Sequence, residues 1–95
     1  MSIIRVTESD SFIIIFFSFQ DKTIAIQSQI DKTFYEVALK FCNQIGGNLT
    51  EYKFYYNSIE IRISNKSLYE IGLNNRSTIN VINAKYIIGG NDGYI

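Results

Sequence analysis

The sequence predicts an α+β domain in which a mixed sheet of about four to five strands packs on one main helix. Three observations support this. An amphipathic helical stripe occupies residues 34–45, β-prone runs lie on both sides of it, and the first and last runs both carry apolar stripes. A tight turn cannot join those two runs, and the helix can bury its stripe only against a sheet that they share.

The chain should hold one domain, because 95 residues with 46% hydrophobic residues suit one small core. We expect a flexible N-terminal arm over 1–11, the folded domain over 12–88, and a tail over 89–95. The arm contains "IIRV" (3–6), followed by the polar "TESDS". The β-prone "IIRV" could add to an edge of the sheet.

A hairpin is predicted from Phe12 onward, where "FIIIFFSF" and "KTIAIQSQ" flank a polar turn. In the second run, Ile24 and Ile26 alternate with smaller or polar residues and should point to the core. The first run is apolar from Phe12 to Phe17. We expect its residues Phe12, Ile14 and Phe16 to point inward, which places three large residues on the outer face: Ile13, Ile15 and Phe17. Such a patch predicts weak homodimers or partner binding, with cover by "IIRV" as the alternative.

The main helix should run from Thr33 or Phe34 to about Gln44. Thr33 and Glu36 have the spacing of a capping box, in which each side chain satisfies a free backbone donor. Five apolar residues then form one stripe: Phe34, Val37, Ala38, Phe41 and Ile45. Gly46-Gly47 follows where a left-handed helix end is expected, so this glycine pair has a structural explanation.

The second half should contain strands at 52–57 and 59–63, a short helical turn in "NKSLYEIGL", and a final strand in "TINVINAKYII". Asn65 or Ser67 could start the helical turn. In the final strand we expect Ile79 and Val81 to point inward, with the residues between and after them facing outward.

Several classes of function are disfavoured by the composition. The chain has no histidine and a single cysteine, Cys42, so it offers no Ser-His or Cys-His pair, no disulfide within the chain and no usual zinc site. We therefore expect no enzyme, cofactor or metal, and a reducing intracellular location in cytoplasm and nucleus. The formal net charge of +0 argues against nucleic acid and membrane surfaces as partners. The apolar run "FIIIFF" is far shorter than the roughly 20 residues of a membrane-spanning helix.

Three blocks in order carry a resemblance: "KTIAIQSQIDKTFYEVALKF", "SLYEIGLNNRSTINVI" and "IIGG". From Phe12 to Gly90 the chain resembles ubiquitin and its relatives. The resemblance implies a β-grasp fold and a protein modifier that is joined to lysines through the carboxylate of Gly90 after removal of 91–95. The implied partners are activating and conjugating enzymes, substrate proteins, and a processing protease or a self-cleaving neighbouring domain.

The resemblance also implies roles for the tail residues. Gly89 and Gly90 would pass through narrow enzyme channels, and Ile87 is apolar where ubiquitin also has an apolar residue that processing enzymes recognise. Ile88 and Tyr86 stand where ubiquitin has arginines, which places activation by ubiquitin's own activating enzyme in doubt.

A binding patch is implied as well, formed by Phe19, Lys53, Tyr55, Asn80 and Ile82. Lys22 and Lys40 coincide with family lysines and are the candidates for chain linkage. Two alternatives share the fold: a binding module that is never conjugated, and a sulfur carrier ending in a thiocarboxylate. The block "SLYEIGL" favours the ubiquitin side over the sulfur carrier.

Overall fold

The structure is a computed structural model that describes residues 12–84. The predicted arm at 1–11, the tail at 89–95 and residues 85–88 lie outside this range. Its elements are β1 (Phe12–Phe19), β2 (Lys22–Gln29), α2 (Phe34–Ile45), the 3-10 turn η1 (Leu49–Glu51), β3 (Tyr52–Tyr56), β4 (Ile59–Ile61), α3 (Leu68–Ile71) and β5 (Ser77–Asn83). The sequence did not predict η1; the other elements match the predicted order.

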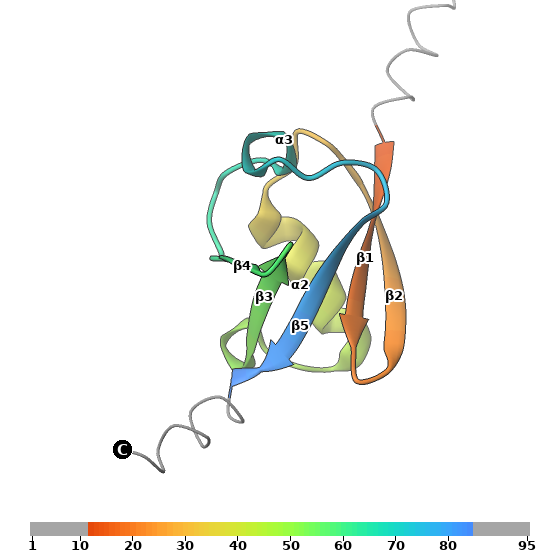
Figure 1. Ribbon diagram of the computed structural model, residues 1–95, viewed down its shortest axis with the longest axis vertical. Helices are drawn as coiled ribbons and strands as arrows, with labels where there is room; N and C mark the ends of the chain where they lie inside the picture. The colour runs from red at the N-terminus through yellow and green to blue at the C-terminus, as the bar shows by residue number, and fades with distance from the viewer. Residues whose placement is uncertain (1–11, 85–95) are drawn as a thin grey trace, which may run out of the picture.

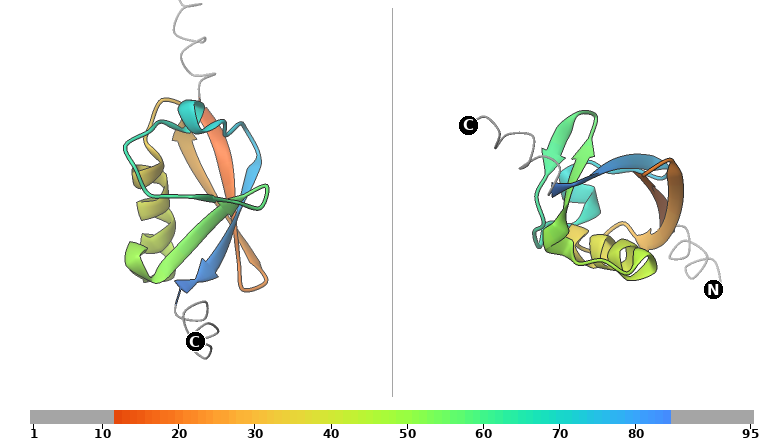
Figure 2. Two further views of the ribbon diagram at one scale, coloured as in Figure 1. Left: turned by 60° about the vertical axis from the view of Figure 1, so that its left-hand side comes forward. Right: turned by 90° about the horizontal axis from the view of Figure 1, so that it is seen from below.

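One five-stranded sheet, in the order β2-β1-β5-β3-β4, carries α2 across one of its faces (Figures 1 and 2). β1 and β5 run parallel at the centre, while the other pairs are antiparallel. A mixed sheet on one main helix confirms the predicted fold class. β1 and β5, from opposite ends of the described chain, lie side by side.

The turn between β1 and β2 decides which face of β1 is buried. Only Gln20 and Asp21 lie between the strands, both with positive φ (50° and 66°), as in the tight turns that match the twist of a hairpin. This turn pairs Phe17 with Ile24 and brings Ile15 opposite Ile26. Residues opposite one another share a face. The inward isoleucines of β2 therefore bring the odd-numbered residues of β1 into the core.

The predicted self-association face is therefore wrong. Ile13, Ile15 and Phe17 are core residues, with only 7%, 0% and 0% of their surfaces exposed. The other three apolar residues of β1 lie on the outer face, where Phe12 is exposed and Ile14 and Phe16 are half-buried. Side chains alternate between faces at every residue, so an error of one residue in the choice of inward positions placed the whole strand on the wrong face.

The predicted helix ends are confirmed. The Thr33 hydroxyl accepts a hydrogen bond from the Glu36 backbone N–H at 3.1 Å, and the Glu36 carboxylate accepts one from the Thr33 N–H at 3.3 Å. Gly46 ends α2 in the left-handed conformation (φ 73°). A Cβ at Gly47 would clash with the Tyr52 ring, so both glycines have structural roles.

Phenylalanines from both layers form the centre of the core. The Phe41 ring of α2 stacks on Phe17 of β1, with 4.7 Å between ring centroids. Phe54 of β3 meets both rings edge-on, at 6.0 Å from Phe17 and 6.1 Å from Phe41. These aromatic contacts join the helix to β1 and β3 and add to the free energy gained by removing their surfaces from water.

The second half of the chain follows the predicted order of elements, but β4 and β5 end earlier than predicted. β4 ends at Ile61 and not at 63, and β5 ends at Asn83, before the end of the predicted final strand. Ser67 rather than Asn65 caps α3, and its hydroxyl accepts a hydrogen bond from the Glu70 N–H at 3.0 Å. Ile79 and Val81 of β5 are buried, while Asn80 and Ile82 are exposed on the outer face.

Candidate functional site: the outer face of the sheet

The face of the sheet opposite α2 brings together most of the predicted binding patch. Tyr55 lies opposite Asn80 in the β3–β5 pairing, and Lys53 lies opposite Ile82. Ile82 has 40% of its surface exposed, and Tyr55 is half-buried beside it. Alternation along both strands holds these four side chains on one face. They form an apolar and polar surface that another protein could contact, and we call them the outer patch.

Phe19 does not belong to the outer patch. Its ring packs edge-on against Phe41 at 5.9 Å and against Tyr52 at 5.3 Å, on the helix side of the sheet. The short hairpin turn explains this placement, because Phe19 follows the buried Phe17 by two residues and so shares its face. The prediction that Phe19 joins Tyr55, Asn80 and Ile82 on one surface is therefore wrong.

The charge within the outer patch is paired. Lys53 Nζ lies 3.4 Å from a carboxylate oxygen of Glu60 on β4, with both side chains partly exposed. An exposed pair of this kind contributes about 0–1 kcal/mol to stability. Its main effect is on the shape and charge of the patch, since it neutralises the lysine next to Ile82.

Solved structures with the same architecture include two solution structures of a ubiquitin-like domain from Arabidopsis thaliana and a de novo design based on ubiquitin. The first solution structure has a TM-score of 0.69 and 21% identity, covering 76% of this chain and 77% of that one. The second has a TM-score of 0.71 and 20% identity, covering 77% and 87%. The design has a TM-score of 0.69 and 19% identity, covering 77% and 89%.

This chain has the ubiquitin-like β-grasp fold. At such identities the likeness shows the fold alone. No protein-family model and no curated protein matches the sequence.

The C-terminal residues of this ubiquitin-like domain leave it from β5, the strand that carries Asn80 and Ile82. The predicted conjugation and processing residues all follow this strand and lie outside the described residues: Tyr86, Ile87, Ile88, Gly89 and Gly90. Gly90 is six residues beyond Ala84, the last residue described. Six residues reach at most about 20–22 Å when fully extended.

The two candidate linkage lysines are both exposed. Lys22 lies at the start of β2, directly after the hairpin turn. Lys40 lies on α2, where its Nζ donates a hydrogen bond to the backbone carbonyl of Gln27 at 3.4 Å. Neither amine is enclosed by the core, so both are open to modification.

Cys42 is buried in the ubiquitin-like core, with 1% of its surface exposed. Burial, reinforced by the negative charge of Glu51, raises the pKa of its thiol from 9.0 to about 11. The thiolate is the nucleophilic form of cysteine, and it is scarce here at neutral pH. Cys42 therefore acts as a core residue.

We expect Cys42 to resist alkylation by iodoacetamide at pH 8 in the folded protein. Two pKa units lower the thiolate fraction by roughly 100-fold, and burial slows the reagent further. Because the folded-state pKa is raised, stability from this group is present below pH 9 and falls as pH rises toward 11. Mass spectrometry of folded and guanidinium-unfolded samples checks the rates; equal labelling would show that Cys42 is accessible.

Residues 12–84 contain no group of three or more potential metal ligands of the His, Cys, Asp or Glu type. Within the same range, the helices are too short or too polar to span a membrane.

Proposed function

We propose that this chain is a ubiquitin-like protein modifier, joined to lysines of other proteins through the carboxylate of Gly90 after removal of residues 91–95. The observation that supports this most directly is the end of β5 at Asn83, seven residues before Gly90, in a domain with the ubiquitin-like fold. The domain then serves as a recognition surface, and the following residues carry the reacting group toward an enzyme.

The chemistry requires a free carboxylate at Gly90. In the 95-residue chain this carboxyl carbon is held in an amide with Asn91, so hydrolysis of that bond is the first step. The freed carboxylate displaces pyrophosphate from ATP, an enzyme thiol displaces AMP, and a lysine amine displaces the thiol. Enzymes of the conjugation pathway supply the thiol, and the modifier itself is their substrate.

Glycine at both positions before the cleaved bond suits passage through a narrow channel, because no Cβ keeps the backbone away from the channel walls. Gly46 and Gly47 differ from this pair, since the helix end and the Tyr52 ring account for them. Ile87 supplies an apolar contact before the glycines. Ile88 and Tyr86 replace the charges that ubiquitin carries there, which favours dedicated enzymes over those of ubiquitin.

The form ending at Gly90 is expected to give a thiol-sensitive adduct when incubated with ATP and an extract of its native cells. Non-reducing and reducing gels compare the adduct with and without dithiothreitol. Gly90→Ala in the same form should reduce adduct formation by about 100-fold, because a small displacement of the reacting atom is costly. The intact 95-residue chain, with processing blocked, is the matched control and should form none.

A non-conjugated binding module is the second candidate, and the outer patch favours it. Ile82 and Tyr55 offer partly exposed apolar surface on adjacent strands, and a partner could contact this surface without any covalent step. Mass spectrometry of the native protein separates the two candidates. Chains that all retain residues 91–95 and form no adduct would contradict the modifier and favour the binding module.

A further inference from the structure

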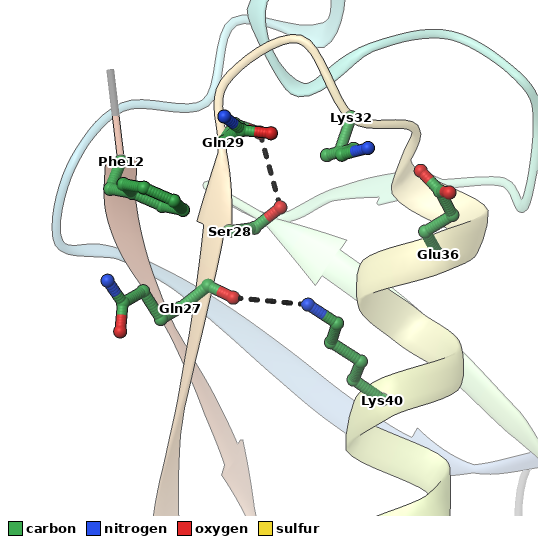
Figure 3. Close-up of a pocket in the computed structure, with 7 residues that line it drawn as sticks. All are labelled: Phe12, Gln27, Ser28, Gln29, Lys32, Glu36 and Lys40. Atoms are coloured by element: carbon green, nitrogen blue, oxygen red, sulfur yellow. Dashed lines mark hydrogen bonds between the residues drawn. The ribbon is translucent and has the colours of Figure 1, made fainter. Parts of the chain in front are cut away.

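A groove of about 270 Å³ lies between the outer edge of β2 and the helix α2 (Figure 3). Gln27, Ser28 and Gln29 form its strand side, and Lys32, Glu36 and Lys40 approach from the segment that leads into α2 and from the helix itself. Phe12, the first residue described, also lines it. The N-terminal segment of the chain therefore joins the domain next to this groove.

Backbone groups of β2 point into the groove. On the side of β1 away from β2, the Ile14 N–H donates a hydrogen bond to Asn75 Oδ1 at 2.9 Å. The Ile14 carbonyl accepts a hydrogen bond from the Arg76 N–H at 2.7 Å on the same side. Ile14 lies opposite Gln27, and its backbone groups are directed away from β2. In an antiparallel pair such residues form no hydrogen bonds with each other, so the N–H and C=O of Gln27 point away from β1. The Gln27 carbonyl accepts a hydrogen bond from Lys40 Nζ at 3.4 Å across the groove (Figure 3).

The same alternation applies at every second residue, so Ala25 also directs its N–H and C=O to the free edge. Gln29 follows, but its carbonyl already accepts the Lys32 N–H at 3.1 Å. β2 is the terminal strand of the sheet formed by residues 12–84 and pairs there with β1 alone. An edge with outward N–H and C=O groups is a template for a further strand.

We propose that residues 3–6 of the same chain, "IIRV", pair with this edge as an additional strand, and that Glu8 and Asp10 lie against Lys32 and Lys40. The occupant is thus a segment of this chain, and the pairing closes the edge of the sheet in cis.

The length of the connecting segment suits this arrangement. An added strand would lie two strand spacings from β1, or about 10 Å away. Residues 7–11 span up to about 16–18 Å when extended, so they can pass over the end of β2 and reach Phe12. Since β1 starts opposite Gln29, the last residue of β2, "IIRV" would run parallel to β2.

Charge complementarity gives the second support. Lys32 and Lys40 line the groove, and neither forms an ion pair with another residue in the range 12–84. The groove carboxylate, Glu36, is already bonded to the backbone and hydroxyl of Thr33 at the helix start. The segment that links "IIRV" to Phe12 carries two acidic residues, Glu8 and Asp10. These charges oppose the two lysines. An ion pair with either carboxylate would draw Lys40 Nζ away from the Gln27 carbonyl and leave that carbonyl open to the added strand.

A covered edge has a consequence for partners. Any extended peptide that binds by adding a strand to β2 must first displace residues 3–6, so the N-terminal segment competes with such partners. It also protects the edge from pairing between copies of the chain.

Amide hydrogen exchange in the 95-residue chain tests the proposal at Ala25 and Gln27. We expect both amides to exchange about tenfold or more slowly in the parent than in the Ile4→Asp/Val6→Asp variant, which removes the strand-forming residues. Glu8→Lys/Asp10→Lys should also accelerate exchange. Adding Lys32→Glu/Lys40→Glu to that variant should restore slow exchange, because the opposed charges are then swapped.

The matched control is Ile59→Asp, at a residue of β4 with 69% exposure on the other edge of the sheet. It should leave exchange at Ala25 and Gln27 unchanged. Equal exchange in the parent and the Ile4→Asp/Val6→Asp variant would overturn the proposal. A different outcome would assign the edge to a second copy of the chain: exchange at Ala25 and Gln27 stays slow in this variant and becomes slower as the protein concentration rises.

Discussion

Replacing Phe41 with alanine is expected to lower the free energy of unfolding by about 3–5 kcal/mol. The Phe41 ring is fully buried, stacks on Phe17, and meets Phe54 edge-on. Its loss leaves a cavity between the helix and the sheet that neighbouring rings can fill only in part. Small domains have total stabilities of about 5–15 kcal/mol, so urea unfolding should show a greatly reduced midpoint.

Leu39→Ala on the same helix is the matched control. Leu39 is 36% exposed, so the same kind of truncation should have a much smaller effect there. Equal midpoints for Phe41→Ala and the parent would show that Phe41 does not join the helix to the sheet.

The double substitution Ile15→Ser with Phe17→Ser is expected to unfold the domain. Both side chains are fully buried, and each truncation alone costs about 2–5 kcal/mol. The new hydroxyl groups would also be buried without assured hydrogen-bond partners, which adds to the cost. Circular dichroism and one-dimensional NMR should show loss of the folded state at room temperature.

Ile14→Ser with Phe16→Ser is the informative comparison, since it makes similar changes on the same strand. Ile14 and Phe16 are half-buried on the outer face, so this variant should remain folded. The reverse result, a folded Ile15→Ser/Phe17→Ser protein and an unfolded comparison variant, would mean that Ile14 and Phe16 point to the core, as first expected from the sequence.

The helix was predictable to within one residue at its C-terminal end because its signals are local. Thr33 and Glu36 mark the start, and Gly46 marks the end through a backbone conformation that other residues rarely adopt. The strand β5 was equally clear, since Ile79 and Val81 alternate with polar Asn80. Where polarity changes at a regular period, sequence alone identifies the buried face.

The inner face of β1 was mispredicted because "FIIIFF" has no alternation to read. The deciding information lay elsewhere, in the inward Ile24 and Ile26 together with the length of the turn. A two-residue turn transfers the alternation of β2 to β1. The error with Phe19 has the same origin, because the turn also determines on which face that ring lies.

The groove between β2 and α2 could not be predicted from the sequence. It depends on Lys40 lying close to the Gln27 carbonyl, two groups on different elements that only the packing of helix on sheet brings together. The amino-acid composition likewise gave no sign that Lys32 and Lys40 would both line this groove.

The parallel pairing of β1 with β5 has a consequence for how the protein is made. Ile15 pairs with Ser77, so the two central strands come from regions about 60 residues apart, and such distant pairing slows folding. On the ribosome, β1 and β2 emerge long before β5 has been translated. Until then, the apolar inner face of β1 lacks its central neighbour and exposes an unpaired strand edge, the kind of surface that makes incomplete chains prone to aggregate. A chain that contains β1 and β2 without β5 is therefore expected to aggregate more readily than the completed domain.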